Sequence, residues 1–150
     1  MPNWGVGTRS KGNEGITAGI RTTPGSIGYV EYGYAKGQHL AMATLENKAG
    51  KFVPPSTPAF EASLEAVEMP EDLIAWLPDP LGDGSYPIVT YTWLLCYKRY
   101  DDAKKLQALK DVIEYCLTEG QKSSEQLGYV PLPASVVAKV KEALNNIHGK

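Results

Sequence analysis

A glycine-rich segment near the start of the chain, residues 7–13 (GTRSKGN), is the strongest candidate for chemistry. It combines two hydroxyls, two cations and two glycines just ahead of an expected helix. Backbone amides at such a turn and at a helix N-terminus, together with nearby cations, favour an oxyanion. The candidate oxyanion-binding loop consists of Thr8, Arg9, Ser10, Lys11, Gly12 and Asn13.

The same segment lacks the phosphate-binding motif GxxxxGK[ST]. Gly7 and Gly12 have the spacing of its two glycines, but Asn13 stands where the motif needs lysine. An ordinary glycine turn with two solvated cations is the simpler interpretation of these residues.

Other residues that could take part in catalysis or metal binding do not cluster in the sequence. His39 and His148 are far apart in sequence, without a carboxylate or cysteine at ligand spacing, so we expect two surface histidines. Neither HExxH nor GxSxG occurs, and no enzyme activity, metal site or cofactor is expected. A tyrosine run, Tyr29, Tyr32 and Tyr34, could stack on bases or sugars, but packing at the edge of a core is favoured because no basic stripe accompanies it.

The composition of the chain argues against two further classes of protein, nucleic-acid-binding proteins and membrane-inserted proteins. The 150 residues carry a net charge of −2, which gives no electrostatic footprint for nucleic acid, and no apolar run is long enough to insert into a membrane. The start of the chain, residues 1–5, shows no basic stretch followed by an apolar run, so we expect no signal peptide in this chain. Cys96 and Cys116 lie among apolar neighbours and are expected to be buried free thiols.

The first half of the chain predicts short elements. Asn13 is a good N-cap for a helix that carries Ile16 and Ile20 on one face and ends at 22–25. Residues 26–30 predict a strand and 31–35 a helical turn, while 40–45 and 51–53 predict the two arms of a hairpin. A helix is expected from 58 or 59 to 67.

The second half predicts longer elements. Residues 88–97 (IVTYTWLLCY) form the strongest predicted strand, and their near-continuous apolarity suggests burial on both faces. Asp101 or Asp102 is expected to cap a long helix with an apolar stripe, followed by a second piece up to Leu127 and a final amphipathic helix over 136–147. The predicted fold class is α/β.

Several segments together resemble a known family. Residues 4–7 (WGVG), 11–15 (KGNEG) and above all 24–35 (PGSIGYVEYGYA) resemble the periplasmic phosphate-binding proteins of phosphate ABC transporters, the PstS type. Residues 86–92 (YPIVTYT), 118–121 (TEGQ) and 127–133 (LGYVPLP) are similar to later segments of that family, in the same order.

The resemblance implies a periplasmic-binding-protein type II-like fold, present in part, because family members are two-lobed and about twice as long. Residues 1–85 would correspond to the later part of lobe two, and residues 86–150 to the C-terminal strand and helices of lobe one. The family's main phosphate ligands lie in segments that find no match here, so no ligand residue carries over. Arg9 and Ser10 also replace glycines of the family.

The implied function is the phosphate-binding component of a phosphate ABC transporter, in a truncated form, with inorganic phosphate and an ABC permease as partners and an exported or periplasmic location. Two alternatives remain: a repurposed or engineered half-protein that serves as a ligand-free scaffold or interaction module, and a weak oxyanion binder that uses the 7–13 loop. Because each lobe would lack strands, we expect a homo-oligomer or a complementary N-terminal fragment.

Overall fold

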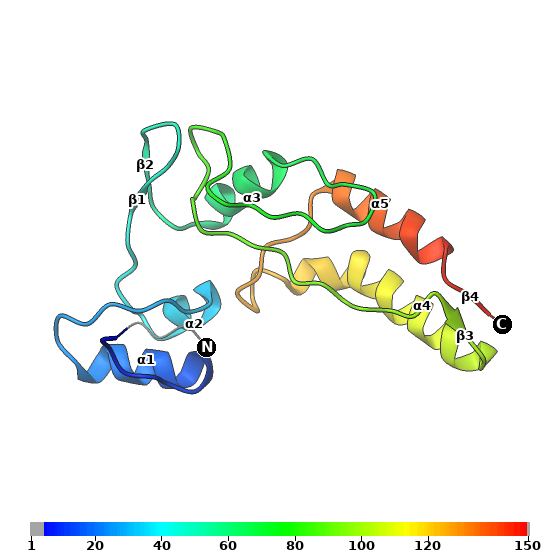
Figure 1. The fold of residues 1–150 in the computed structure, drawn as a ribbon, viewed down its shortest axis with the longest axis horizontal. Coiled ribbons are helices and arrows are strands. Elements are labelled where there is room, and N and C mark those ends of the chain that lie inside the picture. Colours follow the sequence, from blue (N-terminus) through cyan, green and yellow to red (C-terminus); the bar gives the residue numbers. More distant parts are fainter. Residues whose placement is uncertain (1–4, 150) are drawn as a thin grey trace. The chain divides into compact units, whose positions relative to one another are not determined.

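The computed structural model describes residues 5–149. The chain forms two compact units, one ending at Met42 and the other beginning at Ala43 (Figure 1). Residues 1–4, on which most of the expectation about a signal peptide rests, lie outside the described residues. The division by compactness does not test the assignment of 1–85 and 86–150 to two lobes, which stays a prediction.

The first unit is a pair of helices joined by an extended segment. Helix α1 (Gly12–Thr22) is followed by α2 (Tyr32–Gly37), which confirms the predicted helical turn. Gly28 lies in the connection, and a Cβ there would come within 3.1–3.2 Å of Ile20 and Ile16. The absent side chain at position 28 therefore lets the connection pack directly on the apolar face of α1.

Two expectations for this unit are wrong. Residues 26–30 are extended but form no strand, and Ile27 and Tyr29 are exposed, because no neighbouring strand is available to pair with them among the described residues. Asn13 is not the N-cap: α1 begins one residue earlier, Lys11 takes the cap position, and its side chain makes no capping hydrogen bond.

The second unit opens with the predicted hairpin. Strands β1 (Leu45–Glu46) and β2 (Phe52–Val53) pair antiparallel, with Leu45 opposite Val53. The turn closes through a hydrogen bond from the Gly50 amide to the Asn47 carbonyl, 2.8 Å, and Gly50 adopts a φ of 73°. Glycine adopts this left-handed conformation without steric cost, and Gly50 can therefore occupy the last position of the turn.

Asn47 ties this turn to a distant loop. Its side chain is buried, and Nδ2 lies within 3.0–3.1 Å of the carbonyl oxygens of Gly82, Asp83 and Ser85. Its Oδ1 accepts hydrogen bonds from two backbone amides of its own turn, 3.0 and 3.1 Å away. One amide group thus satisfies both the hairpin turn and the 82–85 loop.

Helix α3 (Thr57–Glu65) begins where its sequence favours a start. Ser56 is the N-cap and its hydroxyl accepts from the Ala59 amide, with proline in the first turn. On the buried side, the fully buried Ser63 hydroxyl lies 2.9 Å from the Tyr86 carbonyl, and the Tyr86 amide donates to the Ala59 carbonyl. These contacts fix the 82–87 loop on α3.

The core of the second unit lies between α3, the 69–77 segment, residues 89–91 and α5 (Ala134–Asn145), the final predicted helix. It is an apolar cluster of buried side chains: Leu64, Met69, Ala75, Leu77, Tyr91 and Val136.

The strongest predicted strand differs from its expectation. Residues 88–97 are extended, but the pairing is limited to a single bridge between Pro78 and Ile88. Only one face packs: Tyr91 is buried in the core and Val89 lies against it, whereas Ile88 and Leu94 are 71% and 70% exposed. Burial on both faces is wrong for this chain, because nothing among the described residues covers the other face.

Helix α4 (Ala103–Leu117) follows the short strand β3 (Arg99–Tyr100), which pairs in parallel with β4 (His148–Gly149). The predicted cap is confirmed: Asp102 Oδ1 accepts from the Lys104 and Lys105 amides at 2.8 and 3.2 Å. The apolar stripe of α4, however, is buried only at Leu117.

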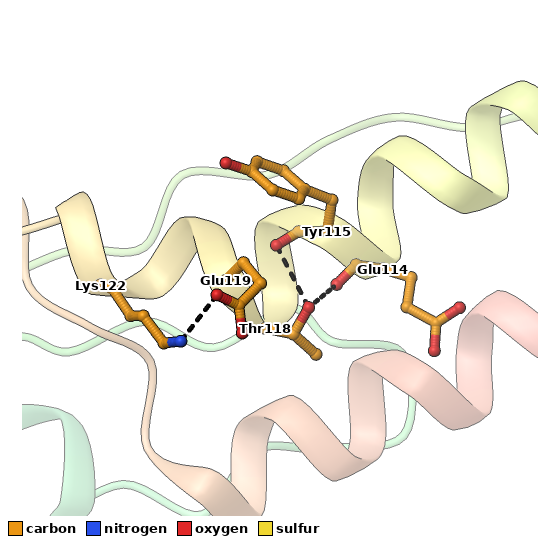
Figure 2. A network of polar contacts seen from close by, with 5 residues as sticks. All are labelled: Glu114, Tyr115, Thr118, Glu119 and Lys122. Atoms are coloured by element: carbon orange, nitrogen blue, oxygen red, sulfur yellow. Dashed lines mark hydrogen bonds and ion pairs between the residues drawn. The ribbon is translucent and has the colours of Figure 1, made fainter.

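The end of α4 is closed by its own side chains (Figure 2). The Thr118 hydroxyl lies 2.8 Å from the Glu114 carbonyl and 3.4 Å from that of Tyr115, satisfying the last turn. A 3-10 helix, η1 (Glu119–Ser123), replaces the predicted second helical piece, and Lys122 pairs with Glu119 at 2.6 Å. Both partners are exposed, so this ion pair adds little stability.

The expectation of buried cysteines is also wrong. Both thiols are free, but Cys96 is only half-buried and Cys116 is exposed. Cys96 lies on the 88–97 segment and Cys116 on α4, and each of these elements has an apolar face that the described residues leave largely uncovered. The mixture of helices with small sheets confirms the α/β class. Across residues 5–149, every helix is too short or too polar to cross a membrane.

The role of Asn47 leads to a stability prediction. Asn47→Ala removes the side-chain partner of two part-buried amides and three carbonyls, of which the contact with Ser85 is buried. We expect the free energy of unfolding to fall by about 3 kcal/mol. The measurement is urea denaturation followed by circular dichroism. Asn146→Ala, at an exposed asparagine, is the matched control and should leave the midpoint unchanged. Equal midpoints for the two variants would contradict the role of Asn47.

Candidate functional site

The predicted oxyanion loop lies in the first unit and runs into α1. Residues 8–12 are all exposed, with Arg9, Ser10 and Lys11 in succession before the helix. No carboxylate of residues 5–149 forms an ion pair with either cation of the loop. The loop is thus accessible and positively charged, as an anion site requires, while Asn13 at its end is half-buried.

Glycines shape this loop. Gly7 and Gly12 have φ values of 95° and 65°, conformations that L side chains rarely adopt. Ser10 approaches the first turn of α1 closely, since a Cβ at Gly15 would come within 3.2 Å of the Ser10 Cβ. The loop therefore folds back over the start of α1 and brings Ser10 to the helix.

Asn13 serves a structural purpose. Its Oδ1 accepts a hydrogen bond from the Glu31 amide, 3.2 Å away, at the position preceding α2. The side chain is consequently engaged with the backbone that leads into the second helix, and does not point its oxygen at the orphan amides of α1.

Glu14 supplies the negative charge at the start of α1. Its carboxylate accepts the Tyr34 hydroxyl at 2.9 Å. A hydrogen bond with its own backbone, and then the one from Tyr34, hold the pKa of Glu14 below its ordinary value of 4.5. The N-terminus of a helix carries a partial positive charge that stabilises a nearby anion. The Glu14 carboxylate already uses this stabilisation, which an external oxyanion would otherwise receive.

The remaining predicted residues lie apart from the loop or act in packing. Tyr34 joins α2 to α1 through Glu14, and the Lys36 ammonium lies 5.6 Å from the centre of the Tyr32 ring. These contacts support the packing interpretation for Tyr32 and Tyr34, whereas Tyr29 is exposed. His39 and His148 are exposed, as expected.

The second unit has a separate surface hollow of about 450 Å³ between the end of α3 and the start of α5. Its cation, Lys139, donates a hydrogen bond to the Met69 carbonyl. This hydrogen bond joins α5 to the segment that follows α3. Lys139 therefore has a structural partner on the wall of the hollow.

Two contacts that organise the chain escaped sequence reasoning. The predicted hairpin has Asn47 in its turn, but the sequence indicates neither the contacts of Asn47 with the 82–85 loop nor the Glu14–Tyr34 pair. Each joins residues far apart in sequence, 35–38 positions for Asn47 and 20 for Glu14. The available signal was an asparagine three residues before a turn glycine, and this pattern does not indicate a distant partner.

A protein-family model described as a PBP superfamily domain matches residues 3–119. The chain belongs to this superfamily, which confirms the expected relation to the periplasmic-binding-protein fold.

Individual relatives narrow the comparison. The chain is 36% identical to the phosphate-binding protein PstS of Pasteurella multocida over 141 residues, which cover 92% of the chain and 41% of that protein. It is 39% identical to the phosphate-binding protein PstS of Methanocaldococcus jannaschii, covering 97% of the chain and 41% of that protein. The phosphate-binding protein PstS 2 of Mycobacterium tuberculosis is 34% identical, over 97% of the chain and 41% of the relative. The chain thus spans about two fifths of these relatives, and the resemblance to part of a PstS-type protein is confirmed.

The contact between Glu14 and Tyr34 leads to a pH prediction. A lowered carboxyl pKa in the folded unit stabilises it above the ordinary value of 4.5, and this contribution disappears as the pH falls through the lowered value. Tyr34→Phe removes one cause of the shift, so the Glu14 titration, followed by carbon NMR of the side-chain carboxyl, should move upward toward 4.5. Tyr29→Phe, at an exposed tyrosine, is the control. An unchanged Glu14 midpoint in Tyr34→Phe would refute the contact.

Proposed function

We propose that this chain is part of the phosphate-binding component of a phosphate ABC transporter, exported from the cytoplasm and working with an ABC permease. The observation that carries the proposal is similarity over 92–97% of the chain to relatives named phosphate-binding protein. The segment 24–35, which carries the strongest resemblance, is the connection that packs on α1 through Gly28.

The chain alone is proposed to bind phosphate weakly or not at all. It matches about 41% of each relative, and the resemblance puts the main phosphate ligands in the part without a match. Binding would then need the remaining part of such a protein, supplied in the same chain or as a complementary N-terminal fragment.

The proposal is tested by titration calorimetry with inorganic phosphate. The chain alone should give little or no heat of binding. A chimera in which this chain replaces the matching stretch of the Methanocaldococcus jannaschii relative should bind phosphate, because the missing ligands are restored. The intact relative is the positive control. A folded chimera that binds no phosphate would contradict the proposal.

The oxyanion loop is a second candidate function, supported by the exposure of Arg9, Ser10 and Lys11 and the absence of ion pairs to these cations among residues 5–149. If the loop binds phosphate, Arg9→Ala with Lys11→Ala should abolish the weak heat that the chain alone gives. Lys48→Ala with Lys51→Ala is a control of equal charge change in the other unit. Unchanged heat in the loop variant, or no heat from the wild-type chain, would remove the loop as a site.

A further inference from the structure

No further inference is drawn: the strongest candidate, the exposed apolar face of α4 around Val112 and Tyr115, carries none because nothing in the structure shows what covers it.

Discussion

The second unit depends on one buried amide. Asn47 satisfies two amides of its own hairpin turn and contacts three carbonyls of the 82–85 loop, and a buried polar group with so many partners is costly to replace. The neighbouring contacts extend this constraint: the Lys48 amide donates to Asp79 Oδ1, and the Tyr86 amide donates to α3. These hydrogen bonds hold the hairpin, the loop and the helix together, and the chain that follows the loop places Tyr91 in the apolar core and Val89 against it.

Local signals were sufficient for most helices, but not for the cap of α1 or for the piece after α4, which is a 3-10 helix. Ser56 and Asp102 cap α3 and α4 as their side chains favour, and α2 lies where a single turn is expected. The strands were harder, because a strand needs partners that are distant in sequence. The hairpin was predictable since its two arms are neighbours, whereas residues 26–30 have no strand partner among the described residues and 88–97 have only the bridge from Ile88 to Pro78. The sequence pattern of 88–97 indicates burial on two faces, and residues 5–149 cover only one.

The candidate site shows the same division. The loop residues 8–13 are contiguous, so their proximity needed no structure, and the glycines that shape the loop were visible in the sequence. The role of Asn13 was not: its side chain bonds the Glu31 amide, 18 positions away. Nor could residue types indicate that Glu14 would already occupy the start of α1 with a hydrogen bond from Tyr34. Family resemblance identifies the kind of protein. The two contacts show that the side chains of Asn13 and Glu14 already have partners within the unit.

The closure of the first unit by a few contacts has a thermodynamic consequence. Asn13 and Glu14 on one side, and Glu31 and Tyr34 on the other, join two short helices that share a small apolar face around Gly28. Such a unit opens at a lower free energy than a large core does. The loop ends at Asn13, one of the residues that join the two helices. If an anion binds the loop as proposed, its binding and the closure of the helices would therefore be linked equilibria. An anion held there would gain apparent affinity from every substitution that tightens the helix pair, including substitutions that never touch the anion.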